Sequence, residues 1–234
     1  MVRKIVRACA FAMAVLACGA APGAGLVSGG GSHSMAVDPG GGVLTWGNDD
    51  WGQLGSGRQI VFASPQQTPS LTGVQAISSG VAHTLGLRAD GTVIAVGDNL
   101  AGQLGDGSWT ARVVPVVVTG LTGVRAIEAG DYTSYAVKAD GTLWAWGYND
   151  LGQLGDGTTT LRSRPVRVSN LAGVVAASGG YDHALAVLAD GSVRAWGANT
   201  YGQLGDGTTD SRSSPVAVGG LSDIVAVSAG AGFS

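Results

Sequence analysis

Short apolar runs separated by glycine-rich polar turns recur along most of this chain. Between two such runs stands the pair Asp140-Gly141, which favours a two-residue hairpin turn. The apolar positions show no 3.6-residue period, and this excludes a helical solenoid. We therefore predict four short antiparallel strands in this stretch, at residues 124–127, 134–137, 142–146 and 165–168. The fourth strand begins with a proline, which suits an outer position because an edge strand needs no backbone N–H donor there.

The same layout returns every 50 residues. A Trp-Gly pair precedes the string Gly-Gln-Leu-Gly in three copies out of four, and a proline follows 13 residues after each start; the string begins at Gly52, Gly102, Gly152 and Gly202. A fixed period of this length indicates one unit stacked on copies of itself. Runs that are apolar on both faces suit blades sandwiched between neighbours. We predict an all-β fold, a β-propeller of four-stranded antiparallel blades, over residues 25–234, with about four blades and a final partial unit.

Composition supports short buried strands joined by tight turns. Charged residues are 12% of the chain, and 41 residues are glycine. The first 24 residues differ from the rest, because Arg3, Lys4 and Arg7 precede an apolar run over residues 8–18 and then small residues. This layout predicts a cleaved signal peptide at residues 1–24 and therefore an exported protein, secreted, periplasmic or on the cell surface of a bacterium. Residues 15–18 also resemble a lipobox, with Cys18 as a possible lipid anchor.

Export would change the charge and the cysteine count. Removing three of the 13 lysines and arginines leaves ten against 16 acidic residues, a formal net charge of −6. Such an acidic chain offers no electrostatic footprint for nucleic acid. With both cysteines inside the first 18 residues, a disulfide framework, a cysteine metal site and a cysteine nucleophile are excluded.

The repeat also resembles a known family. The pattern Trp-Gly-x-Asn-x-x-Gly-Gln-Leu-Gly-Asp-Gly-Thr-Thr, at residues 146–159 and 196–209, is similar to the regulator-of-chromosome-condensation repeat, as is the segment 179–187. The resemblance implies a propeller, commonly seven-bladed, that serves as an interaction platform. Its name-giving members act on chromatin and on a small GTPase. Because the chain holds four periods, we expect an open arc that belongs to a longer protein. The alternative is a four-bladed ring, in which residues near Ala226 would pair with those near Met35.

Histidine is restricted to one repeat position, occupied by His33, His83 and His183, with Thr133 and Phe233 in the other copies. A ring of imidazoles around the propeller axis could bind a metal. The interpretation we favour is structural, a hydrogen bond within the blade that carries each histidine, because threonine and phenylalanine cannot complete a ligand ring.

A recurrent Asp–Arg spacing is the second candidate for chemistry. An aspartate is followed six residues later by an arginine in three copies, and the first copy has lost both, carrying Ser56 and Phe62. Joint loss indicates a structural pair that holds the long loop; the pairs are Asp106 with Arg112, Asp156 with Arg162 and Asp206 with Arg212. Calcium binding is the alternative, but one carboxylate per loop is few for an ion that takes six to eight oxygens.

The positions that vary between copies are the better guide to a partner. Large aromatic or apolar side chains on loops often anchor protein interfaces, although ordinary loop packing explains them equally well. The candidate partner-binding residues are Trp51, Trp109, Tyr148, Leu151 and Tyr201.

No catalytic constellation, phosphate loop or acid pair stands apart from the repeat, so we expect no catalytic residue, cofactor or metal. The sequence favours a non-enzymatic exported propeller that binds a protein through one loop face. Two alternatives stay open: guanine-nucleotide exchange, for which regular 50-residue spacing leaves no room for an inserted wedge, and a hydrolytic propeller enzyme.

Overall fold

The computed structural model describes residues 26–38 and 40–234, and within them sixteen strands form four antiparallel sheets. The first blade contains β1 (Leu26–Gly29), β2 (His33–Val37), β3 (Val43–Gly47) and β4 (Phe62–Gln67). The second contains β5 (Val74–Ser79), β6 (His83–Arg88), β7 (Val93–Gly97) and β8 (Arg112–Val117). The third contains β9 (Val124–Ala129), β10 (Thr133–Lys138), β11 (Leu143–Gly147) and β12 (Arg162–Arg167). The fourth contains β13 (Val174–Gly179), β14 (His183–Leu188), β15 (Val193–Gly197) and β16 (Arg212–Ala217).

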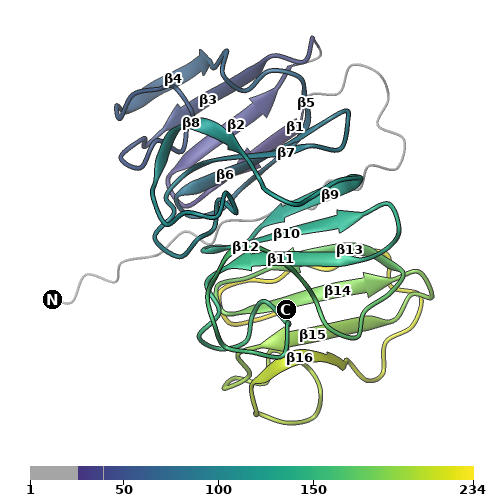
Figure 1. Cartoon of the computed structure of the whole chain (residues 1–234). Helices are drawn as coiled ribbons and strands as arrows, with labels where there is room; N and C mark the ends of the chain where they lie inside the picture. Colours follow the sequence, from purple (N-terminus) through teal and green to yellow (C-terminus); the bar gives the residue numbers. More distant parts are fainter. Residues whose placement is uncertain (1–25, 39) are drawn as a thin grey trace, which may run out of the picture.

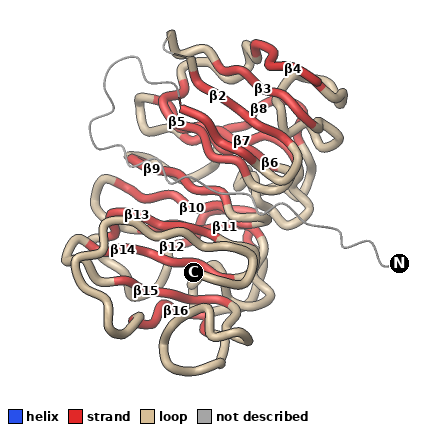
Figure 2. Tube along the Cα trace, turned by 180° about the vertical axis from the view of Figure 1, so that it is seen from behind, coloured by secondary structure: helices blue, strands red, loops and turns tan. Residues whose placement is uncertain are grey.

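Each sheet is a simple meander in which neighbouring strands in the sequence are neighbours in space. The four sheets follow one another through the molecule, from β1–β4 to β13–β16 (Figures 1 and 2). Apolar cores lie between consecutive sheets. Leu85 and Leu87 of β6, for example, share a cluster with Trp146 of β11, which is fully buried. Because both faces of an inner blade are covered, its strands are apolar on both sides, as the sequence predicts.

The outer strand of each blade differs from the prediction. In the third blade β12 begins at Arg162, three residues before Pro165. Arg162 pairs with Gly147 and Val166 pairs with Ala145, so the register shifts by a bulge between them. Pro165 therefore lies inside the strand, beside the bulge, where an edge strand tolerates a missing ladder donor. The expectation that this proline leads the strand is wrong.

The Gly-Gln-Leu-Gly loops join each blade to the next. The amide of Gly107 donates to the carbonyl of Ser163 at 2.9 Å, and Gly57 and Gly157 make the same bond to their next blades. Gly102 has a φ of +81°, and a Cβ there would lie 2.7 Å from Cα of Ser163. Glycine is required at this position by the backbone conformation and by the close approach of the neighbouring strand.

The described residues form an open arc rather than a four-bladed ring. Ser28 of β1 pairs with Met35, so β1 occupies the position that the ring would assign to residues near Ala226. Those residues instead pack against the fourth blade, where the amide of Ile224 bonds to the carbonyl of Gly191. A groove of about 560 Å³ remains at this end of the arc. None of the described residues belongs to a helix long and apolar enough to cross a membrane.

Candidate partner-binding face

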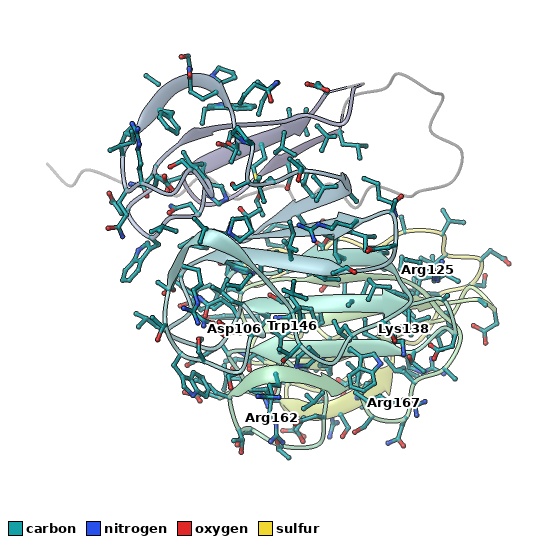
Figure 3. All side chains as sticks on the ribbon, turned by 45° about the horizontal axis from the view of Figure 1, so that its top comes forward. Asp106, Arg125, Lys138, Trp146, Arg162 and Arg167 are labelled. Atoms are coloured by element: carbon teal, nitrogen blue, oxygen red, sulfur yellow. The ribbon has the colours of Figure 1, made fainter. Side chains whose placement is uncertain are left out.

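The strands place two kinds of connection at opposite ends of every blade. One end of the blades, here named the loop face, carries the connections from first to second strands and from third to fourth strands. The short first-to-second connections are residues 30–32, 80–82, 130–132 and 180–182, and the long third-to-fourth connections are residues 48–61, 98–111, 148–161 and 198–211. The tight Asp-Gly turns lie at the other end, here named the turn face. Figure 3 shows Asp106 and Arg162 toward the loop face, and Lys138 and Arg167 toward the turn face.

The Asp–Arg pairs close the long loops of the loop face. Nη2 of Arg112 lies 2.8 Å from Oδ2 of Asp106, and the equivalent distances are 2.7 Å for Arg162 with Asp156 and 3.0 Å for Arg212 with Asp206. The other carboxylate oxygen of Asp106 accepts from the amide and the hydroxyl of Ser108. Each aspartate is thus engaged by groups of its own loop, so the geometry is that of a structural clamp.

An asparagine in each of these loops, apart from the first, makes several hydrogen bonds that hold the loop together. Oδ1 of Asn149 accepts the amide of Leu154 at 2.9 Å, while its Nδ2 donates to the carbonyls of Thr158 and Thr160. The first blade uses different groups for the same purpose. There Asp49 accepts both the amide of Leu54 and the hydroxyl of Ser56. The first loop thus closes on its own acid without the Asp–Arg pair.

The environment of Asp156 keeps its carboxylate ionised. Burial alone would raise the pKa of Asp156, but hydrogen bonds from Thr158 and Arg162 outweigh burial, so the net shift is downward. Asp206 has the same partners, with the Thr208 hydroxyl the largest influence, and its pKa is lowered to about 2. These groups remain charged under all ordinary conditions.

The histidines bond across blades, not within them. Nε2 of His33 lies 3.1 Å from the hydroxyl of Thr84, and His83 makes a 3.0 Å contact with Ser134. Each hydroxyl donates in turn to a glutamine carbonyl of a Gly-Gln-Leu-Gly loop, as Ser134 does to Gln103 at 2.8 Å. The expectation of a bond within the blade is therefore wrong, because Nε2 points at the next blade's second strand.

One boundary between blades lacks the histidine–hydroxyl bond and uses a different hydrogen bond in its place. At the third-to-fourth boundary Thr133 replaces the histidine and Ala184 replaces the hydroxyl residue. Tyr135, at the position of Leu85, donates its hydroxyl to the carbonyl of Gln153 at 2.8 Å. The tyrosine hydroxyl thus replaces the missing serine or threonine hydroxyl as a donor to the glutamine carbonyl, which also accepts from Nε1 of Trp196.

The five residues expected to bind a partner all lie on the long loops of the loop face. Trp51 is 41% exposed, Trp109 48% and Tyr201 82%, so these rings are open to solvent. Leu151 is exposed as well, whereas Tyr148 is half-buried. They come from four different blades, and of the five only Tyr148 lines the pocket described next.

Around Tyr148 the structure gathers residues that the sequence analysis did not connect. A pocket of about 390 Å³ is lined by Asp98, Leu100, Ala101, Tyr132, Tyr148, Leu161 and Tyr181. The rings of Tyr132 and Tyr181 meet edge to face, with centroids 6.0 Å apart. We name this the tyrosine pocket. Three blades contribute residues to this pocket.

Carboxylates surround the tyrosine pocket. The hydroxyl of Tyr148 donates to Asp150 at 2.9 Å, and this bond, burial and the nearby charge of Asp182 raise the pKa of the tyrosine. Burial and the charge of Asp131 raise the pKa of Asp182, so these two acids from adjacent blades are close enough to interact. Among the described residues, no salt bridge engages Asp98, Asp131, Asp150 or Asp182.

Comparison with known proteins agrees with this architecture. A family model described as RCC1-like domain matches residues 19–234. The chain belongs to the RCC1-like family. No curated protein matches the chain.

Solved RCC1-like structures share the fold. Human WBSCR16 is 25% identical with a TM-score of 0.79, and the match covers 88% of this chain and 55% of that one. Prp20p from Saccharomyces cerevisiae is 24% identical with a TM-score of 0.77, covering 88% and 53% respectively. The structure of Prp20p is reported with its binding properties to Gsp1p and histones. This RCC1-like chain spans about half the length of these relatives.

Two further features of this RCC1-like chain bear on chemistry. In residues 26–38 and 40–234, no group of three His, Cys, Asp or Glu side chains is arranged to hold a metal ion. Glu128 occupies a position that is serine in the other copies and is buried with one oxygen unpartnered. Burial raises its pKa to about 8, against the opposing influence of a hydrogen bond from Ser78, so the side chain is largely protonated at neutral pH.

Proposed function

We propose that this RCC1-like chain is a non-enzymatic exported propeller that binds a protein partner through its loop face. The proposal rests on one observation: the exposed aromatic residues among the predicted candidates, Trp51, Trp109 and Tyr201, all lie on loops at this one end of the blades. Aromatic side chains are the commonest anchors of protein interfaces. Among the solved relatives, yeast RCC1 (Prp20) has been crystallised with Kap60, which supports protein binding as the family's use of the fold.

Site-specific photo-crosslinking tests which face binds. A photoreactive amino acid replaces Leu151 on the loop face or Val175 near the turn face; the two native side chains are 40% and 39% exposed. The proposal expects a discrete crosslinked partner from position 151 in cells and none from position 175. Crosslinks from position 175 alone, or from neither position, contradict it.

The proposal of export depends on the first 24 residues, Cys18 among them, which lie outside the described residues. The mass of the purified native protein tests it: the proposal expects a mature N-terminus between Ala20 and Ala24, or a lipidated Cys18. An intact Met1 on a cytosolic protein contradicts export and leaves the loop-face proposal standing.

Nucleotide exchange on a small GTPase is the second candidate, favoured by the reported binding of Prp20p to Gsp1p. An assay of labelled nucleotide release from a small GTPase separates the two functions. Under our proposal the chain leaves the release rate unchanged, whereas catalytic acceleration would establish the exchange function instead.

A further inference from the structure

The tyrosine pocket differs from every equivalent place in the arc. One repeat earlier the positions of its three tyrosines hold Ala82, Asp98 and Asp131, and one repeat later they hold Asp182, Ala198 and Ala231. Residues that recur in each blade build the blade, so departures that converge in space require another explanation. Three tyrosines from two blades meet here, beside a loop of a third blade.

The pocket combines aromatic walls with negative charge. Tyr132, Tyr148 and Tyr181 supply ring surface, and Leu100 and Leu161 extend the apolar lining. Asp98 contributes a carboxylate to the lining itself, and Asp150 is bound to the hydroxyl of Tyr148. Aromatic faces attract cations, and the attraction is greatest where water is partly excluded.

The carboxylates are not neutralised by this chain's own cations. Oδ1 of Asp98 accepts the amide of Leu100 at 3.1 Å, and Oδ2 accepts Nε2 of Gln103 at 2.8 Å. Both donors are neutral amide groups, so neither supplies a counter-charge. In the described part of the chain, salt bridges engage only Asp106, Asp140, Asp156 and Asp206. A cationic ligand would therefore find both its stacking surface and its counter-charge here.

We propose that the tyrosine pocket binds the side chain of an arginine presented by the protein partner. A guanidinium is planar, so it stacks on aromatic rings while pairs of its N–H groups donate in parallel to carboxylate oxygens. The compact lysine ammonium does not offer this planar geometry. A pocket of about 390 Å³ holds one such side chain and leaves an open mouth for the backbone that carries it. The inference rests on the proposed function, since it identifies the partner's chemistry at the same loop face.

The probe is the peptide acetyl-Gly-Ser-Arg-Ser-Gly-amide, titrated into the full chain with the tyrosine ring signals followed by NMR. Its control carries citrulline, a neutral side chain of nearly the same shape, and a third peptide carries lysine. We expect saturable shifts at Tyr132, Tyr148 and Tyr181 with the arginine peptide. Relative to the arginine peptide, the citrulline peptide should bind about tenfold or more weakly, and the lysine peptide should lose less affinity than the citrulline peptide. Equal binding of arginine and citrulline, or no binding of arginine, overturns the proposal.

The repeat itself supplies variants that preserve the fold. Tyr132→Ala and Tyr148→Ala install the residues found at Ala82 and Ala198, and Asp98→Asn installs the residue found at Asn48. Asn48 already makes the equivalent bonds to Asp50 and Gln53.

Each of these variants should weaken the arginine peptide about fivefold or more with an unchanged melting temperature. Asp140→Asn on the turn face, the matched charge control, should leave binding unchanged. Pocket variants that bind like the parent chain, or equal loss with Asp140→Asn, contradict the assignment.

The peptide titration and the photo-crosslinking fail independently. Crosslinking from position 151 without arginine-peptide binding overturns the pocket assignment and leaves the loop-face platform standing. Peptide binding without any loop-face crosslink supports the pocket and contradicts the platform.

Discussion

At the scale of single residues, the Asp–Arg pairs link the loop's sequence to its stability. Asp156 is nearly buried while Arg162 is 34% exposed, so solvent weakens their attraction without removing it. We expect a double-mutant cycle with Asp156→Ala and Arg162→Ala to give a coupling of about 0.5–1.5 kcal/mol in the free energy of unfolding. The control is Lys138 with Asp140, whose charged atoms are 3.9 Å apart on the surface. That cycle should give nearly zero, and equal coupling in the two cycles would argue against a clamp.

The buried histidines predict the chain's response to acid. Burial, with a smaller effect of His33, lowers the pKa of His83 to about 3. Folding therefore favours the neutral imidazole. The stabilisation is fully present above the unfolded pKa of about 6.5 and is lost as pH falls from there toward the folded value. Between pH 7 and pH 5 the loss from His83 is about 1–2 kcal/mol.

Denaturant unfolding at the two pH values checks this expectation against the double variant His83→Thr with Ser134→Ala. That variant copies the pair Thr133 and Ala184 that the chain already carries at another interface. Its stability should fall less between pH 7 and pH 5 than that of the parent chain. Glu128 acts in the opposite direction in both proteins, because its raised pKa stabilises the fold at low pH, and so it cancels in the comparison. An identical pH dependence would mean that His83 has the same pKa in the folded and the unfolded chain, and it would contradict this expectation.

At the scale of the blade, contact between neighbours depends on one glycine per loop. Gly152 has a φ of +81° and a Cβ there would lie 2.5 Å from Cα of Ser213 in the next blade. Gly202 has a φ of +74° but nothing within 4 Å of the same position. Both alanine variants incur the cost of a left-handed residue, about 1–2 kcal/mol, and only Gly152→Ala also separates two blades. We expect a lower melting temperature for Gly152→Ala than for Gly202→Ala. Equal melting temperatures would show that the blade contact contributes nothing.

Part of the blade structure follows from local sequence, and part depends on contacts between distant residues. Periodicity and turn chemistry predict three strands of each blade closely, because alternating apolar runs and Asp-Gly turns act locally. The start of β12 was missed because the pairing of Arg162 with Gly147 across a bulge is a tertiary feature. Likewise, the spacing of Asp156 and Arg162 predicts their meeting within one loop. The bond from His83 to Ser134 and the convergence of Tyr132 with Tyr181 need the rotation between blades, which one repeat does not encode.

At the scale of the whole molecule, a recurring framework supports loops whose residues differ between copies. Glycine loops, buried indoles and cross-blade hydroxyl bonds recur from blade to blade, as in the bonds of Trp146 to Gln103 and Trp196 to Gln153. Substitutions between copies occur in strands as well as loops, and three of those on the loop face are the tyrosines of the tyrosine pocket. Under the proposed function, the recurring residues build the arc and the loop substitutions provide the contacts to a partner.

Hydrogen–deuterium exchange of the chain with and without its crosslinked partner tests the loop-face assignment most directly. Binding should slow amide exchange in residues 98–111, 130–132, 148–161 and 180–182. The turns at residues 89–92 and 139–142 should exchange at the same rate in both states and serve as the internal control. Protection confined to those turns, with the loop residues unchanged, would contradict the account.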